Sequence, residues 1–218
     1  MTDAAALEIE GLSVAYRAGS ARVQALDRVD LSVPAGQRLA VVGESGSGKS
    51  TLGLAVMGLL PKNAAFDYQR VAVGGRALDL RNQRELRARR GREMSMVFQD
   101  AKASLDPVRT VGSQIAEPLR AHRIVGRRQV GDEVVRLLTA VEIPRPEGAA
   151  RQYPHELSGG MRQRAMIAAA LAGRPTVLIA DEPTSALDVT TQATVIDLIR
   201  RIGDGACLLY TSPSPRDS

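Results

Sequence analysis

A glycine-rich loop is the part of this sequence with the clearest chemical capacity. Residues 43–50 read Gly-Glu-Ser-Gly-Ser-Gly-Lys-Ser, which matches the pattern G-x-x-x-x-G-K-[ST]. Its glycines let backbone N–H groups converge on phosphate oxygens, a following helix adds the positive end of its dipole, and Lys49 adds a charge. We expect Ser50 to bind Mg²⁺. The predicted phosphate-binding residues are Gly43, Gly46, Ser47, Gly48, Lys49, Ser50 and Thr51.

Two carboxylates follow an apolar segment further along the chain. Residues 176–180 read Thr-Val-Leu-Ile-Ala, which is typical of a buried strand, and Asp181 and Glu182 come directly after it. Beside a phosphate loop, Asp181 would reach Mg²⁺ directly or through water, and Glu182 would orient and deprotonate an attacking water. An acidic pair at a strand end is weak evidence by itself, but together with the loop it predicts a hydrolytic site.

A Ser-Gly-Gly step, Ser158-Gly159-Gly160, opens a helical segment upstream of Asp181. Its hydroxyl and amides form a second phosphate cradle. One nucleotide has one γ-phosphate, and Lys49 already addresses it, so two cradles suggest two nucleotides. In a head-to-tail dimer the second cradle would close over the nucleotide held by the partner's loop. The alternative interpretation is an ordinary N-capped helix.

The hydrophobic pattern predicts the elements that position these groups. Alternating apolar residues near the N-terminus predict an antiparallel sheet, and helical spacing predominates in the middle of the chain. The fold class is therefore α/β: a P-loop NTPase core with an N-terminal antiparallel β portion and an inserted helical lobe at about 102–156. The predicted strands span 7–16, 25–33, 38–43 and 176–180, and the predicted helices span 49–60, 115–119, 132–141 and 161–172.

The composition excludes several classes of protein. The chain has 218 residues, of which 44% are hydrophobic and 24% charged, so it is not disordered, collagen-like or coiled-coil. No apolar run reaches the roughly 20 residues that cross a bilayer, and the N-terminus lacks a secretory signal. One cysteine cannot form an internal disulfide. We therefore expect a soluble cytoplasmic domain. The net charge of +5 rests on 26 Arg and 3 Lys; six of the Arg lie within 81–92, where we expect a solvated face and no nucleic-acid partner.

Taken in order, these motifs resemble the ATP-binding subunit of an ABC transporter, over residues 7 to about 206. The resemblance identifies the Walker A loop, the signature at 157–161, the Walker B strand at 177–182 and a D-loop at 185–188. It implies ATP and Mg²⁺ as cofactors, and it implies that Tyr16 stacks on adenine. Gln99, as the Q-loop residue, would contact Mg²⁺ and the attacking water and link the nucleotide to membrane subunits. The implied catalytic residues are Lys49, Gln99 and Glu182, and the implied metal ligands are Ser50, Gln99 and Asp181.

The strings at 104–107 and 153–164 are similar to the dipeptide, oligopeptide and nickel importer branch, with Met161 as in the first of its two ATPases. This branch implies a motor that powers import of peptides or a related small solute. Its partners would be a second ABC ATPase subunit and transmembrane permease subunits, at the cytoplasmic face of the membrane. Ala101 and Lys102 depart from the branch's usual Pro and Met. His155 precedes the signature and is interpreted as structural.

The last residues differ in kind from the rest. Residues 207–217 look like the translation of a transposase adapter used in sequencing libraries, and from Tyr210 onward we see no core-facing pattern. We therefore divide the chain into an incomplete ABC-type nucleotide-binding domain, 1–206, and a non-native tail, 207–218. The tail occupies the place of the family's switch histidine, for which neither His122 nor His155 substitutes by position. We expect this chain to bind ATP, to hydrolyse it poorly and to leave one sheet edge uncovered.

The motifs leave three alternatives open: two other kinds of ATPase and an inactive fragment. A soluble accessory ATPase of a multienzyme complex, of the carbon–phosphorus lyase type, is hardly separable by sequence. A DNA-repair or chromosome-organising ATPase would carry a coiled coil or zinc module between Gln99 and Ser158, and the sequence shows no sustained heptad or cysteine pair there. The last alternative is an inert fragment.

Overall fold

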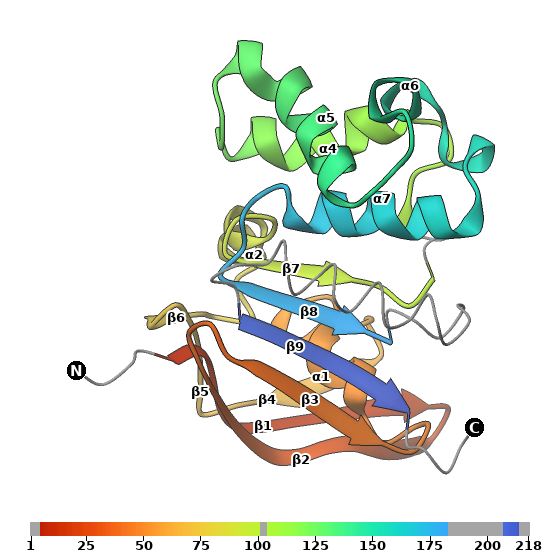
Figure 1. Ribbon diagram of the computed structural model, residues 1–218. Coiled ribbons are helices and arrows are strands. Elements are labelled where there is room, and N and C mark those ends of the chain that lie inside the picture. The colour runs from red at the N-terminus through yellow and green to blue at the C-terminus, as the bar shows by residue number, and fades with distance from the viewer. Residues whose placement is uncertain (1–4, 101–103, 183–206, 214–218) are drawn as a thin grey trace.

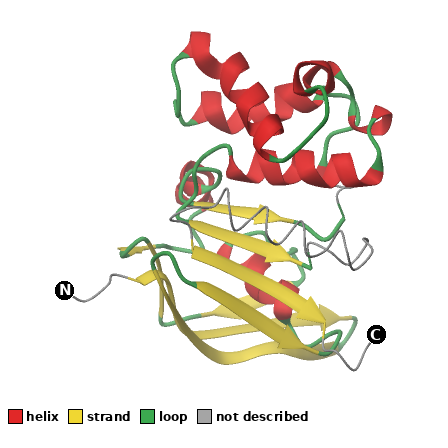
Figure 2. Ribbon diagram, in the orientation of Figure 1, coloured by secondary structure: helices red, strands yellow, loops and turns green. Residues whose placement is uncertain are grey.

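The computed structural model describes residues 5–100, 104–182 and 207–213 (Figure 1). Two β-sheets lie on either side of a helix, and a group of helices covers the outer face of one sheet (Figure 2). This arrangement confirms the predicted fold class, including the inserted helical lobe. The helices are α1 (Lys49–Val56), α2 (Gln83–Arg89), α4 (Val111–Ala121), α5 (Val130–Ala140), α6 (Pro146–Arg151) and α7 (Gly159–Leu171), with 3₁₀ turns at Arg127–Gln129 and Pro154–Glu156.

The first sheet is antiparallel, as the alternating N-terminal pattern predicts. β1 pairs with β2 along nearly its whole length, from Ala5 opposite Pro34 to Ala18 opposite Ala21. β4 and β5 pair with the other edge of β1, and β6 extends the sheet beyond β5. The strands are β1 (Ala5–Ala18), β2 (Ala21–Pro34), β4 (Ala64–Asp67), β5 (Arg70–Val73) and β6 (Arg76–Ala77).

The second sheet is parallel throughout, in the order β3-β9-β8-β7. A parallel sheet gathers the carboxyl ends of its strands at one edge, which is where such folds bind ligands. The glycine loop after β3, Gln99 after β7 and Glu182 after β8 all meet that condition. The strands are β3 (Arg38–Gly43), β7 (Met94–Val97), β8 (Val177–Asp181) and β9 (Cys207–Pro213).

Strand β9 corrects one expectation from the sequence. The chain from Tyr210 onward was expected to lack a core-facing pattern, but β9 continues to Pro213 and lies between β3 and β8. The side chains of Cys207 and Leu209 are fully buried, and that of Thr211 is 2% exposed. The run Cys-Leu-Leu-Tyr-Thr therefore acts as an interior strand of the sheet, between β3 and β8. The interpretation of 207–218 as a non-native tail concerns the origin of these residues and stays a prediction.

The apolar side chains form two cores, one on each face of the parallel sheet. One core joins α1 to both sheets, through residues such as Val56, Ile9 and Ile179. The other core joins α7 and the helices α4 to α6 to the opposite face of the parallel sheet, through residues such as Ile167 and Leu178. The helical lobe is therefore packed onto the sheet through α7.

Helix α1 is shorter than predicted. The sequence predicts a helix to Leu60 stopped by Pro61, but α1 ends at Val56 and Gly58 takes a φ of +61°. Arg90 donates to the carbonyls of Met57 at 2.7 Å and Gly58 at 2.8 Å, and so satisfies carbonyl groups that a helix end leaves without partners. Burial, with repulsion from Arg87 second, lowers the pKa of Arg90 from its ordinary value. The end of α1 is therefore held by a tertiary contact from Arg90, which lies 32 or more residues further along the chain.

Candidate functional site

The loop between β3 and α1 is held in a closely defined conformation. Gly48 has a φ of +91°, and a Cβ atom there would lie 2.5 Å from the carbonyl oxygen of Ala25. Only glycine fits both conditions. Lys49 is 6% exposed, and its ammonium donates to the carbonyls of Gly43 at 2.7 Å and Glu44 at 2.8 Å. The charge expected beside a phosphate is therefore fixed within the loop that would carry the phosphate.

The serine after that lysine meets the first carboxylate of the acidic pair. Ser50 Oγ donates to Asp181 Oδ1 at 2.8 Å, across a separation of 131 residues in the chain. These two residues were predicted as metal ligands from separate motifs, and the fold brings them together. A hydroxyl and a carboxylate are the oxygen donors that Mg²⁺ prefers, with water and substrate phosphate completing its shell. The residues present therefore fit a magnesium ion.

Thr211 is a site residue that the sequence analysis missed. Its Oγ1 donates to the same Asp181 Oδ1 at 2.8 Å and accepts from the backbone N–H of Glu182 at 3.0 Å. One hydroxyl thus fixes the orientation of one carboxylate and the backbone of the next residue. The apolar run before Thr211 indicates a strand, but no local signal in the sequence indicates that this strand pairs with β8.

The second carboxylate meets the residue predicted from the Q-loop. Gln99 Nε2 donates to Glu182 Oε2 at 2.8 Å, so the ends of β7 and β8 are joined by their side chains. Glu182 has a φ of +42°, a left-handed conformation that is uncommon for a residue with a side chain. Backbone strain of this kind is concentrated at functional sites. An amide and a carboxylate held 2.8 Å apart could together orient a water molecule.

Tyr16, in β1, contacts the first turn of α1. Its hydroxyl is 3.1 Å from Thr51 Oγ1, and either oxygen could be the donor. This bond connects β1 of the antiparallel sheet to the first turn after the glycine loop. Both residues were predicted to contact the nucleotide, one at adenine and one at phosphate, and the fold places them in contact with each other.

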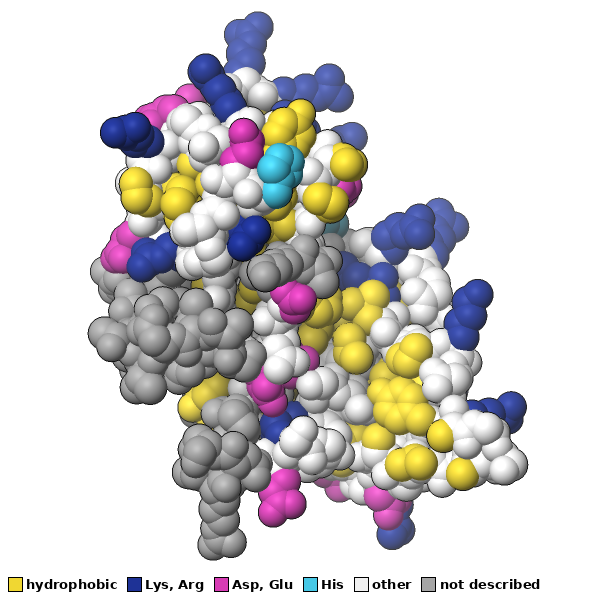
Figure 3. Space-filling view, turned by 90° about the vertical axis from the view of Figure 1, so that its right-hand side faces the viewer, with side chains coloured by type: hydrophobic (Ala, Val, Ile, Leu, Met, Phe, Trp, Pro, Cys, Tyr) yellow, Lys and Arg dark blue, Asp and Glu magenta, His cyan; other side chains and the backbone are white. Residues whose placement is uncertain are grey.

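The Ser-Gly-Gly step lies at the N-terminus of α7, some way from the glycine loop. Ser158 is the N-cap, and its Oγ accepts from the N–H of Met161 at 3.3 Å. A Cβ atom added at Gly159 or Gly160 would meet nothing within 4 Å. In Figure 1 the start of α7 and the carboxyl ends of β3 and β8 point to the same side of the molecule. Figure 3 looks onto that side, where acidic side chains lie in the middle and basic ones surround the lobe.

Several predicted features lie apart from the residues that meet at the edge of the parallel sheet. The D-loop at 185–188 and the departures at Ala101 and Lys102 lie outside the described residues. His155 stacks on Tyr153, with ring centroids 5.6 Å apart, which is consistent with a structural role. Among residues 5–100, 104–182 and 207–213 there is no group of three or more His, Cys, Asp or Glu side chains arranged to hold a metal ion.

Some of the arginines within 81–92 bond to groups of the protein itself. Arg89 is 7% exposed and bonds to the carboxylates of Glu85 and Glu93 and to the carbonyls of β5 and β6. Arg81 pairs with Asp67 at 2.8 Å and lies over the ring of Tyr68. Arg89 is therefore held by the protein itself, whereas Arg81, Arg84, Arg87 and Arg92 are exposed, as a solvated face requires.

Comparisons with known proteins agree with this geometry. The family model described as ABC transporter matches residues 26–185. The dimeric ATP-binding cassette MJ0796, solved in a post-hydrolysis state bound to ADP and Pi, superposes with a TM-score of 0.79 and 28% identity, covering 94% of this chain and 87% of that one. This chain belongs to the ABC transporter family.

The similar curated proteins bear the names of peptide import or peptide transport ATP-binding proteins. The "Putative peptide import ATP-binding protein" of Brucella ovis is 48% identical over 90% of this chain. The oligopeptide transport ATP-binding protein OppD of Bacillus subtilis is 43% identical over 89% of this chain. The chain spans 60% of the length of the Brucella protein and 54% of the Bacillus protein. Within the part of the chain that the structure describes, no helix is long and apolar enough to cross a membrane.

Proposed function

We propose that this chain is an ATP-hydrolysing motor subunit that powers import of peptides or a related small solute through a membrane permease. The observation that carries the proposal is the meeting of four motif residues at one sheet edge, in two bonds of 2.8 Å: Ser50 to Asp181 and Gln99 to Glu182. The names of the similar proteins supply the transported class, and they favour an importer over the multienzyme-complex and DNA-repair alternatives.

In this proposal the glycine loop binds the triphosphate. The backbone amides of residues 46–51 donate to its oxygens, and Lys49 turns its ammonium from the loop carbonyls to the phosphates. Ser50 and Asp181 would hold Mg²⁺, and the bound ion would neutralise charge on the phosphates. Tyr16 packs beside the adenine. These residues bind and orient the nucleotide before any bond is broken.

The two carboxylates have different roles: Asp181 binds the metal ion and Glu182 accepts a proton. Glu182 accepts a proton from water while Gln99 orients that water toward the γ-phosphorus. The new bond joins the water oxygen to phosphorus, and the bond from phosphorus to the β-phosphate oxygen breaks, leaving ADP and phosphate. Ser158, Gly159 and Gly160 of a second ABC subunit complete the site from the opposite side. The cassette would work at the cytoplasmic face of the membrane, in contact with the permease through the Q-loop region.

The substitution Glu182→Gln tests this assignment. The glutamine keeps an oxygen that can accept the hydrogen bond from Gln99, but it cannot take a proton from water. We therefore expect ATP binding to persist and steady-state hydrolysis to fall by about 10²- to 10⁴-fold. The control is Glu147→Gln, a like change at an exposed carboxylate in α6. Phosphate release and equilibrium nucleotide binding measure the two quantities separately. Unchanged turnover in Glu182→Gln would remove the proposed base.

A second experiment tests the transport assignment. Purification of the cassette with its membrane permease subunits, followed by an increase in its ATPase rate on reconstitution with them, is the expected result. Isolation with soluble enzymes of a multienzyme complex instead would favour the accessory-ATPase alternative and contradict the importer assignment.

A further inference from the structure

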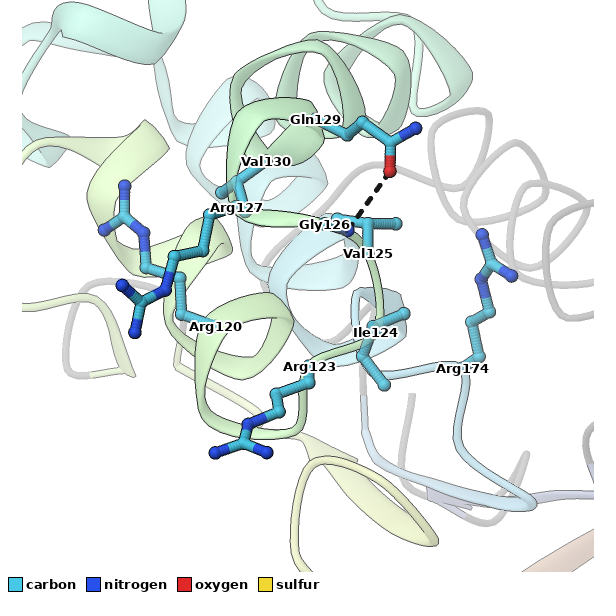
Figure 4. A pocket seen from close by; sticks show the side chains of 9 residues that line it. All are labelled: Arg120, Arg123, Ile124, Val125, Gly126, Arg127, Gln129, Val130 and Arg174. Atoms are coloured by element: carbon cyan, nitrogen blue, oxygen red, sulfur yellow. Dashed lines mark hydrogen bonds between the residues drawn. The ribbon is translucent and has the colours of Figure 1, made fainter.

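A basic cavity lies between the α4–α5 connection and the turn that precedes β8 (Figure 4). Its volume is about 880 Å³, within the range of small-molecule sites. Figure 4 shows Arg120 and Arg127 together on one side and Arg174 on the opposite side, with Ile124 between them. We call it the rear cavity, and its charged lining residues are Arg120, Arg123, Arg127 and Arg174.

The charge in the rear cavity is not balanced by its own walls. No Asp or Glu lines it, and within the described part of the chain the side chains of Arg120, Arg123 and Arg127 make no ion pair. Arg174 reaches Glu133 at 3.4 Å, but that carboxylate also accepts two shorter bonds from Arg136. Cations gathered around one cavity repel each other, and a bound anion would relieve that repulsion.

The contrast with the arginine-rich segment at 81–92 makes the rear cavity unusual. In that segment, Arg89 and Arg90 donate hydrogen bonds to carboxylates and carbonyls of neighbouring elements. In the rear cavity the guanidinium groups of Arg120, Arg123 and Arg127 make no such bond among the described residues, and that of Arg174 makes only its 3.4 Å bond to Glu133. A smaller hollow of about 410 Å³ adjoins it and shares Ile124 and Arg174. Its other charged lining residues are Arg92, Arg76 and Glu93, and the last two pair with each other. The basic surface therefore continues beyond the first cavity.

The rear cavity is separate from the nucleotide site. Arg174 precedes the amino end of β8, whereas Asp181 and Glu182 lie at its carboxyl end. Five residues of strand span about 16 Å. An anion bound here would not be the triphosphate that the glycine loop holds. It would instead bridge the α4–α5 connection of the lobe to the turn that leads into the sheet.

We propose that the rear cavity binds a multiply charged oxyanion, a phosphate ester or a pyrophosphate group. The planar guanidinium group donates pairs of hydrogen bonds that match phosphate oxygens, and several of them around one cavity select for more than one charge. The apolar side chains of Ile124, Val125 and Val130 offer a surface for the uncharged part of the ligand. Both a soluble phosphorylated compound and a phospholipid headgroup present this chemistry.

Titration calorimetry with inorganic pyrophosphate tests the proposal. The nucleotide site is first saturated with Mg²⁺ and a non-hydrolysable ATP analogue, so that pyrophosphate does not compete there. The double variant R123Q/R127Q is compared with R84Q/R87Q, which removes the same charge from two exposed arginines of α2. We expect saturable binding that weakens at least tenfold in R123Q/R127Q, stays within twofold in R84Q/R87Q, and falls as salt increases.

Vesicle sedimentation separates the two sources of the ligand. Vesicles of phosphatidylcholine with 30% phosphatidic acid, whose phosphate monoester can carry two charges, are compared with pure phosphatidylcholine. Vesicle binding that R123Q/R127Q removes, without pyrophosphate binding, assigns the rear cavity to a lipid headgroup and supports the proposal. Failure to bind either probe, or equal loss in both double variants, would overturn it. ATP binding unchanged in R123Q/R127Q shows that the variant is folded.

Discussion

The two glycine-containing segments of this cassette are built differently. We call the loop at 43–50 the first glycine step and Ser158-Gly159-Gly160 the second glycine step. In the loop before α1, glycine is required at Gly48 by a left-handed φ and a close backbone carbonyl, and Lys49 is buried against two loop carbonyls. At the start of α7, Gly159 and Gly160 border open space, and one cap bond at 3.3 Å holds Ser158. The first step is organised by its own chain, whereas the second presents its backbone outward.

This difference indicates which part of the chemistry the chain can do alone. Its own residues organise the glycine loop and join it to Asp181 through Ser50, while Thr211 holds both Asp181 and the backbone N–H of Glu182. An outward-facing cap with free backbone space suits a ligand that arrives from elsewhere. We therefore expect nucleotide binding to depend on the first glycine step and turnover to depend on both, with the second acting on a partner's nucleotide.

The largest expected effect on nucleotide affinity comes from Lys49→Ala. It removes the charge and the buried ammonium that the loop is built around, so we expect ATP affinity to fall by at least a hundredfold. Fluorescent-nucleotide titration measures this loss. Lys62→Ala, at an exposed lysine after α1, is the control and should bind normally. Retained affinity in Lys49→Ala would show that the first glycine step is not the phosphate cradle.

Substitutions of Ser158 should separate the two steps. Ser158→Asp keeps an N-cap acceptor for α7, because Asp caps as well as Ser, but brings a negative charge toward the partner's triphosphate. We expect unchanged ATP affinity and unchanged melting temperature, with turnover reduced by about 10²- to 10³-fold. Ser158→Thr, which keeps the hydroxyl, is the control. Full activity in Ser158→Asp would leave capping as the only role of Ser158.

A smaller effect is expected from Thr211→Val, which keeps the shape of the side chain and removes its hydroxyl. Asp181 Oδ1 loses one of its two donors, and the N–H of Glu182 loses its acceptor. A lost buried hydrogen bond costs about 1 to 3 kcal/mol. We expect the Mg²⁺ concentration needed for half-maximal nucleotide binding to rise roughly tenfold. Thr211→Ser should restore it, and an unchanged Mg²⁺ requirement would mean that Thr211 does not position the carboxylate.

The smallest effect concerns the strand that supports the first step. Burial raises the pKa of the Cys207 thiol to about 11. Above about pH 9 the thiol ionises in the unfolded chain while it stays protonated in the folded one, so the free energy of unfolding should fall between about pH 9 and 11, by at most 2 to 3 kcal/mol. Urea unfolding at pH 8 and pH 10.5 measures this, with Cys207→Val as the control that lacks the thiol. A thiol that reacts with Ellman's reagent at pH 8 without unfolding would contradict the burial of β9.

The sequence predicted the fold class and most elements because their signals are local. Strand alternation in β1 and the order of strand, glycine loop and helix needed no distant contacts to be recognised. It failed where distant residues decide the outcome. The end of α1 depends on Arg90, and the place of β9 depends on pairing with β3 and β8. Thr211 was missed for the same reason, because its role exists only once β9 lies beside β8.

The central claim is that the second glycine step serves a nucleotide held by another chain, and photo-crosslinking tests it directly. A tagged Lys49→Ala chain, unable to hold ATP in its own loop, is mixed with an untagged Glu182→Gln chain and an ATP analogue that carries an aryl azide on its γ-phosphate. After irradiation, we predict labelled peptide from residues 158–161 of the tagged chain, and loss of that label when Ser158→Asp is added to it. Label confined to the untagged chain's own loop would contradict the claim.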